Sequence, residues 1–179
     1  MERIKPTPAE QKAQAHRVAQ ELKRFEPGFI PEPLYSEGLR LWPGITIELV
    51  PLRIKDEKVE VLLIKRSPSD KFWPNELHVP GTMIRSGKDE TFDATLERLF
   101  KDDLANTKID SMFLAGESLH TTKRGKEFAK IYCTEIEGKP SIGKFYDVEN
   151  LPEETVGHHR DIIIPTAVKL FIELQKLTL

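Results

Sequence analysis

The chain has 179 residues, which is enough for one domain with a substantial hydrophobic core. Charged residues make up 31% and apolar residues 39%, so the composition excludes an intrinsically disordered chain. The formal net charge is -2 and the Lys and Arg residues are scattered, which argues against nucleic acid as a partner.

The cellular context follows from two features of the composition. No stretch approaches the ~20 consecutive apolar residues of a membrane span, and the first residues, MERIKPTPAE, contain no apolar signal-peptide region. The single cysteine, Cys133, lies in the apolar run IYCTEI and has no cysteine partner for a disulfide or a zinc site. We therefore expect a cytoplasmic protein with a reduced core thiol and no membrane partner.

The first predicted element is an N-terminal helix. Thr7 is a potential N-cap, Pro8 suits the first helical position, and Glu10 completes a capping box. Apolar residues then recur at helical spacing and form one narrow stripe: Ala15, Val18, Leu22 and Phe25. We expect this stripe to pack on the same domain or on a second copy of the chain, so a homodimer is one expectation.

A proline-rich connector follows. Four prolines between Pro27 and Pro43 predict an extended segment without regular structure. The sequence is accordingly divided into residues 1–41, the N-terminal helix and connector, and residues 42–179, the main domain.

The main domain begins with strands. The runs ITIELVPLRI and VEVLLIKR flank Asp56-Glu57-Lys58 and predict a hairpin, and LHV predicts a short strand that ends at Pro80-Gly81. A helix is predicted over residues 90–106, followed by strands in MFLAGESLHTT, EFAKIYCTEI and KFYDV. Pro165 can open a last helix, whose buried side is predicted to carry Val168, Phe171 and Ile172. This order indicates an α/β protein with a mixed sheet between helices.

The helix at 90–106 ends unusually, with Asp102 and Asp103. Acidic side chains at a helix C-terminus oppose the macrodipole by roughly 0.3–1 kcal/mol each. Asp102 and Asp103 share one aspect of the helix with Leu99, because the three positions are i, i+3 and i+4. Either the pair forms a solvated helix end, with Arg98 bonded to Asp102, or it binds a cation.

The stretch HVPGTMIRSGKDETFDATLERLFKDDLAN resembles the Nudix box of the Nudix hydrolases. Glu90 and Arg98 match that box in type and spacing, and Gly81 matches its opening glycine. Asp102 and Asp103 fall on its glutamate pair as shorter carboxylates. The surrounding runs VLLIKRS, LHVPG and FYDVENLPEE also resemble Nudix proteins, so the resemblance covers approximately residues 42–175.

Several positions depart from the box. Thr82 replaces the second glycine, Leu99 replaces the first glutamate after Arg98, and Ala105 replaces the terminal glycine. The loop before Glu90 is longer by two residues. Leu99 thus removes one carboxylate from the helix face that would hold metal.

The resemblance implies a Nudix-like α/β/α sandwich with a mixed sheet and an additional N-terminal helix. It implies a hydrolase of a nucleoside diphosphate derivative that depends on Mg (or Mn), with Asp102, Asp103 and the carbonyl of Gly81 as metal ligands. Glu90 and Arg98 would hold the loop and helix together. The phrase KDETFDATLERLFKDDL is also similar to GDP-mannose mannosyl hydrolases, which suggests a nucleotide sugar as substrate.

The general base stays open at this stage. His158 and Glu154 are the catalytic candidates, beside the further histidines His120, His159 and His78. For each, a hydrogen-bonded or helix-start role is the simpler structural interpretation. Three arginines could bind phosphates by bidentate hydrogen bonds or be ordinary surface charges: Arg53, Arg66 and Arg85.

A second function class fits the same residues. Because Leu99 stands where the box has a glutamate, the domain could be a catalytically silent Nudix domain that binds a nucleotide, a metabolite or a protein. Turnover of nucleotide derivatives separates this alternative from the hydrolase.

Overall fold

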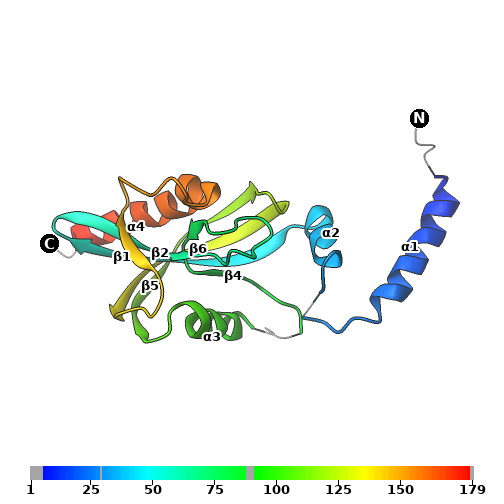
Figure 1. Cartoon of the computed structure of the whole chain (residues 1–179), viewed down its shortest axis with the longest axis horizontal. Coiled ribbons are helices and arrows are strands. Elements are labelled where there is room, and N and C mark those ends of the chain that lie inside the picture. The colour runs from blue at the N-terminus through cyan, green and yellow to red at the C-terminus, as the bar shows by residue number, and fades with distance from the viewer. Residues whose placement is uncertain (1–5, 29, 88–90, 178–179) are drawn as a thin grey trace.

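The computed structural model describes residues 6–28, 30–87 and 91–177 (Figure 1). Its described part contains a seven-stranded sheet in the order β3-β2-β1-β6-β5, with β4 paired to β1 and β7 paired to β2. The strands are β1 (Gly44–Lys55), β2 (Lys58–Lys65), β3 (Leu77–His78), β4 (Gly81–Met83), β5 (Thr107–Thr121), β6 (Lys126–Gly138) and β7 (Lys144–Asp147). The helices are α1 (Pro8–Leu22), α2 (Leu34–Leu41), α3 (Phe92–Asp103) and α4 (Ile164–Leu177), with a π-helical turn, η1 (His159–Ile163), before α4.

The sheet is mixed and lies between α3 and α4 (Figure 1). β1 runs parallel to β6 and antiparallel to β2 and β4. The predicted fold class, a mixed α/β sandwich with an added N-terminal helix, is confirmed.

β1 changes partners along its length. It pairs with β4 over residues 46–48 and with β2 over residues 52–55. Glu48 is therefore the last residue of β1 that pairs with β4, just before β1 passes to its pairing with β2. The candidate site lies here.

Two apolar cores hold the layers together. The core on the α4 face includes Val50, Leu63, Ile131, Ile163 and Phe171. The core on the α3 face consists of Ile47, Leu49, Leu62, Leu96, Leu99 and Leu104, with further residues packed against it. The alternation of burial along β6 explains the first core, because every second residue from Glu127 to Cys133 faces α4.

The hairpin between β1 and β2 forms as predicted. Asp56 and Glu57 adopt positive φ values of 50° and 63°, so the two-residue turn matches the twist of the strands. The predicted short strand at LHV is also present as β3, and β4 continues the chain directly after Pro80.

The predicted irregular connector is wrong in part, because α2 lies within it. Pro33 occupies the N-cap and the next proline is Pro43, so the eight residues of α2 contain no proline to break a helix. Leu39 anchors α2 with 7% of its surface exposed. A Cβ on Gly125 would overlap the carbonyl oxygen of Leu39, so the turn before β6 needs glycine for this close approach.

The predicted start of the last helix is also wrong. Helical structure begins at Gly157 and continues through η1, and Pro165 is the second residue of α4. Pro165 has no N–H to donate to the preceding turn, where the hydrogen-bonding pattern is π-helical. Phe171 is buried as predicted, whereas Ile172 is 40% exposed and does not belong to the buried side.

The start of α1 is confirmed in detail. The N–H of Glu10 donates to Oγ1 of Thr7 at 3.3 Å, and the N–H of Thr7 donates to Oε2 of Glu10 at 2.8 Å. These two bonds form the reciprocal capping box and satisfy donors at the helix N-terminus.

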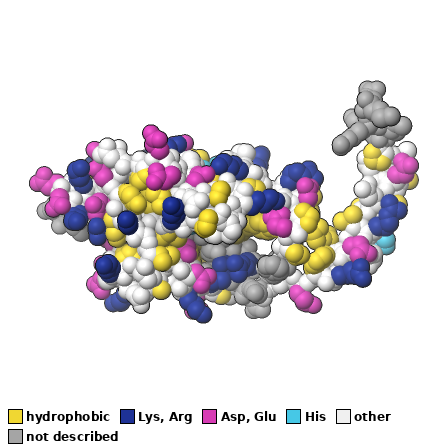
Figure 2. All heavy atoms as spheres, in the orientation of Figure 1, with side chains coloured by type: hydrophobic (Ala, Val, Ile, Leu, Met, Phe, Trp, Pro, Cys, Tyr) yellow, Lys and Arg dark blue, Asp and Glu magenta, His cyan; other side chains and the backbone are white. Residues whose placement is uncertain are grey.

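The position of α1 overturns one expectation. α1 stands away from the sheet (Figure 1), and every residue from Pro8 to Leu22 is exposed. Val18, Leu22 and Phe25 are 51%, 44% and 41% exposed, and Figure 2 shows apolar side chains at the surface of this helix. The stripe therefore does not pack on its own domain, and packing on a second copy stays a prediction.

We predict that removal of residues 1–25 leaves the melting temperature of the rest unchanged within about 1 °C, because α1 contributes no buried side chain. As the control, Leu39→Ala in the full chain should cost about 2–4 kcal/mol, since Leu39 is buried. Scanning calorimetry at several protein concentrations measures both. A truncation that lowers the melting temperature, with a concentration dependence that disappears at the same time, would place the stripe in a dimer instead.

Within the described residues, no helix has the length and apolar character needed to cross a membrane.

Candidate functional site

Two carboxylates approach Gly81 from different elements. Glu48 lies on β1 directly opposite Gly81 on β4, and its side chain is buried on the α4 face of the sheet. Asp103 is the last residue of α3, and the N–H of Gly81 donates a hydrogen bond to its carboxylate. We call Glu48 and Asp103 the carboxylate pair.

Gly81 makes this approach possible because it has no side chain. A Cβ at this position would overlap Oε2 of Glu48. That oxygen is fully buried and makes no hydrogen bond of good geometry among the described residues, although the nearby Thr46 hydroxyl favours the charged form of the carboxyl group. A buried oxygen without a partner is costly, unless it carries a proton or binds a cation.

The electrostatics of the carboxylate pair point the same way. Burial raises the pKa of Glu48 to about 8, with a further contribution from the negative charge of Glu127. Burial also raises the pKa of Asp103 to about 6, although the N–H of Gly81 favours its charged form. A cation bound beside Gly81 would therefore favour the charged form of each carboxyl group.

The pair fits a hard divalent cation. Mg²⁺ prefers oxygen ligands, often one or two carboxylates, and keeps several waters. Asp103, Glu48 and the backbone of Gly81 could supply such ligands. Asp102, the other predicted ligand, is exposed at the end of α3 and does not share this buried setting.

Arg98 connects α3 to β4 beside the pair. Its guanidinium donates to Oγ1 of Thr82 at 2.6 Å and to the carbonyl of Met83 at 3.0 Å. These bonds hold the strand that carries Gly81 against the helix that carries Asp103. Glu90, the predicted partner of Arg98 in the box, lies outside the described residues.

A second group of side chains lies further along the α4 face. His120 on β5 and Glu127 on β6 are direct cross-strand partners, so their side chains share one face. His158, which precedes η1, completes the group, and one ligand atom from each residue lies within 4.8 Å of those of the other two. We call His120, Glu127 and His158 the histidine cluster.

Glu127 is fixed by its neighbours. Arg124 donates to both of its carboxylate oxygens, at 3.0 and 2.7 Å, and the hydroxyl of Thr122 donates to Oε1. Only 1% of Glu127 is exposed, and the paired guanidinium holds the pKa of this carboxyl below its usual range despite burial. Glu127 is therefore charged at neutral pH.

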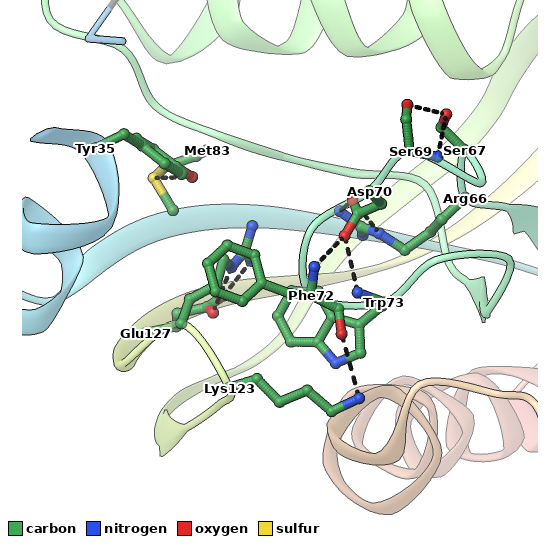
Figure 3. Close-up of polar contacts among 11 residues, drawn as sticks. Tyr35, Arg66, Ser67, Ser69, Asp70, Phe72, Trp73, Met83, Lys123 and Glu127 are labelled. Carbon is green, nitrogen blue, oxygen red and sulfur yellow. Dashed lines mark hydrogen bonds and ion pairs between the residues drawn. The ribbon is translucent and has the colours of Figure 1, made fainter. Parts of the chain in front are cut away.

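Trp73 packs against His158 of the histidine cluster from a loop. Its ring lies 4.7 Å from the guanidinium of Arg124, 5.2 Å from that of Arg66 and 5.3 Å from the ring of His158. Asp70 shapes the loop, because it accepts hydrogen bonds from the N–H groups of Phe72 and Trp73 and from Arg66 (Figure 3). Trp73 is only 3% exposed, so it covers the core rather than offering a free stacking surface.

The three predicted phosphate-binding arginines lie in different places. Arg66 is half-buried between Asp70 and Trp73, near the carboxylate pair. Arg53 bonds Glu60 and lies 3.8 Å from the ring centre of Phe145, near the β1–β2 turn. Arg85 is exposed two residues after β4.

The two predicted catalytic residues, His158 and Glu154, lie in different environments. His158 lies in the histidine cluster, and burial lowers its pKa to about 4, so it is neutral at pH 7. Glu154 is exposed, and its backbone carbonyl accepts a hydrogen bond from the N–H of Leu77. His78 and His159 are buried with their ring centres 5.8 Å apart, and burial lowers the pKa of each.

Sequence reasoning missed Glu48 and Glu127. Glu48 is an acidic residue in the apolar run ITIELV, and this signal could have identified it, whereas Glu127 in KEFAK lies between lysines and carries no such signal. A charge on the buried face of a strand requires a partner or a ligand, so it indicates a site more strongly than a charge on a helix surface does.

We predict a pH-dependent difference between the metal-free protein and Glu48→Gln. The folded-state pKa of about 8 lies above the ordinary value of 4.5, so folding favours the protonated acid. This advantage is complete below pH 4.5 and is lost as the pH rises through 8. The free energy of unfolding of wild type should therefore fall relative to Glu48→Gln, approaching a loss of about 4 kcal/mol near pH 8. Urea unfolding from pH 5 to 9 in a chelator measures it, and parallel curves would contradict it.

No family model matches the sequence, and no curated protein matches it. Solved structures do match. A mutT/nudix family protein from Listeria innocua shares 18% identity over 76% of this chain and 99% of that one, with a TM-score of 0.58. An Ap4A hydrolase from C. elegans shares 16% identity over 74% and 99%, with a TM-score of 0.50.

A third similar structure is the NUDIX domain of Shewanella oneidensis NrtR, solved with ADP ribose. It shares 17% identity over 79% of this chain and 99% of that domain, with a TM-score of 0.50. The match to the longer NrtR chain spans 63% of its length. At these identities the likeness concerns the arrangement of strands and helices.

Proposed function

Because the chain has the Nudix hydrolase fold, we propose that it is a Mg²⁺-dependent hydrolase of a nucleoside diphosphate derivative. The observation that carries the proposal is the carboxylate pair at Gly81, with its raised pKa values and the unpartnered oxygen of Glu48. Gly81 opens the Nudix-like segment, and Asp103 falls on a metal-binding position of the box, so fold and local chemistry coincide at one point.

Asp103 and Glu48 would hold the ion, with Asp102 as an outer ligand reached from solvent. A bound Mg²⁺ neutralises a diphosphate and lowers the pKa of a coordinated water. The protein would position the ligands of the ion. Arg98 fixes the strand of Gly81 relative to α3, and burial restricts the side chain of Glu48.

Glu48 takes the place of the carboxylate that Leu99 lacks. Its carboxylate lies beside the Gly81 backbone and comes from β1 instead of from the helix. This placement supports the hydrolase over the catalytically silent alternative, because a buried carboxylate, Glu48, and a partly buried one, Asp103, both lie beside Gly81.

Two of the three predicted arginines, Arg85 and Arg66, would contact the phosphates of the substrate. Arg85 follows β4 directly and is exposed, so it can meet an anionic substrate that enters from solvent. Arg66 lies deeper and lowers the pKa of Asp103 through its charge. Either Glu154 or His158 would serve as the base, and the neutral imidazole of His158 can accept a proton at pH 7.

The substrate is tested with a panel of nucleotide sugars, ADP-ribose and dinucleoside polyphosphates, incubated with Mg²⁺ or Mn²⁺. We expect Mg²⁺-dependent release of phosphate, nucleotide or sugar from one class, with nucleotide sugars as the first choice from the sequence. The full chain is used, and products are separated by chromatography.

The alternative function has a different result. A silent binding domain would show thermal stabilisation by one nucleotide without any turnover across the panel. That outcome, with Mg²⁺ present, would overturn the hydrolase proposal and leave the fold unaffected.

A further inference from the structure

The histidine cluster carries chemistry that a magnesium-dependent hydrolase does not need. Two imidazoles and one carboxylate, from His120, His158 and Glu127, converge within 4.8 Å on the α4 face. Mg²⁺ prefers oxygen donors, whereas imidazole suits Zn²⁺ and neighbouring transition metals. From this convergence we propose that the histidine cluster is a second metal site, which takes a Zn²⁺-type ion.

His120 is prepared to act as a ligand. Its Nδ1 lies 3.2 Å from the hydroxyl of Ser118, and its Nε2 is buried without a hydrogen-bond partner among the described residues. A bond from Nδ1–H to Ser118 leaves the lone pair of Nε2 free for a metal, as in other zinc sites where the second ring nitrogen fixes the tautomer.

Glu127 is prepared as well. Arg124 and Thr122 hold its carboxylate in place, and a carboxylate has about four lone-pair sites, so an ion can share the group with these donors. Such outer partners orient the ligands of metal sites. The negative charge of Glu127 persists at neutral pH, since its pKa is lowered.

His158 completes the three ligands. Its ring lies 5.1 Å from that of His120 and 4.5 Å from that of His159, so packing limits its orientation. Burial lowers its pKa to about 4, and a neutral imidazole is the form that binds metal. Three protein ligands leave a further position for water, which is typical of open zinc sites.

This site does not depend on the proposed hydrolase. The carboxylate pair offers oxygen donors at Gly81, and the histidine cluster offers nitrogen donors held by Ser118 and Arg124. An ion in the cluster would occupy the lone pair of His158, so His158 could not serve as a base while the ion is bound.

The test titrates Co²⁺ alone into the metal-free full chain and follows its visible absorption, with Zn²⁺ then added as a competitor. We expect one strongly absorbing Co²⁺ per chain, as a site with few ligands gives, displaced by Zn²⁺; Co²⁺ that enters the carboxylate pair would keep several waters and absorb only weakly. His120→Ala and His158→Ala should each weaken binding by about 100-fold or more, and Ser118→Ala by about 10-fold. Circular dichroism confirms that each variant is folded.

Two controls separate this proposal from the hydrolase. His16→Ala removes an exposed histidine of α1 and should leave Co²⁺ binding unchanged. Glu48→Gln removes a proposed Mg²⁺ ligand and should also leave it unchanged. Absence of the strong Co²⁺ absorption in wild type, or strong absorption that persists in folded His120→Ala and His158→Ala, would overturn the site whatever the result of the hydrolase assays.

Discussion

Replacement of Asp103 by asparagine is expected to weaken Mg²⁺ binding by about 100-fold and to reduce Mg²⁺-dependent turnover by a similar factor. Asp103 accepts a hydrogen bond from the N–H of Gly81, the residue beside the Glu48 carboxylate, and burial raises its pKa. Asparagine keeps the shape but loses the negative charge. Titration calorimetry with Mg²⁺ and a product assay measure the two effects.

Asp102→Asn is the matched control. Asp102 precedes Asp103 in the same helix turn and is exposed, so the same substitution there should reduce Mg²⁺ affinity by less than about tenfold. Equal losses at both positions would show that the ion lies outside the carboxylate pair.

Gly81→Ala tests whether Glu48 is a Mg²⁺ ligand without removing any ligand atom. The added methyl group would overlap Oε2 of Glu48 and displace its carboxylate, so Mg²⁺ affinity should fall although no ligand atom is removed. If Gly81→Ala binds Mg²⁺ as wild type does, Glu48 is not a ligand, and the proposed site loses one of its two carboxylates.

Leu99→Glu is expected to destabilise the fold by roughly 4 kcal/mol or more. Judged from sequence alone, this change restores the missing glutamate of the box. In the structure Leu99 is 1% exposed and packs with Leu96 and Leu104 against the α3 face of the sheet. A glutamate there would bury a carboxyl group among apolar side chains and remove a leucine from the core.

Leu99→Met is the control for this position, because methionine preserves volume and apolar character and should cost less than about 1.5 kcal/mol. Urea unfolding of both variants measures the difference. A stable Leu99→Glu protein that binds Mg²⁺ more tightly than wild type would show that this face of α3 reaches the metal, contrary to the packing.

The local elements of this protein follow from nearby residues. The capping box of Thr7 and Glu10, the turn at Asp56-Glu57 and the apolar period of α3 each concern residues a few positions apart, and the structure contains all three elements. The helix α2 was not predicted because the position of a proline, and not the number of prolines, decides whether a helix can form. Pro33 lies at the N-cap, where a proline does not interrupt the helix.

The sequence by itself therefore determined the mixed α/β class and most of its strands and helices, α2 and β4 excepted, and it singled out the segment around Gly81 and Asp103. Only the tertiary structure decided which residues face the buried acids Glu48 and Glu127. Glu48 faces Gly81, and His120 faces Glu127, because of strand registers that no local period encodes. Burial then sets their proton and metal affinities, since desolvation depends on everything packed around a carboxylate and not on its neighbours along the chain.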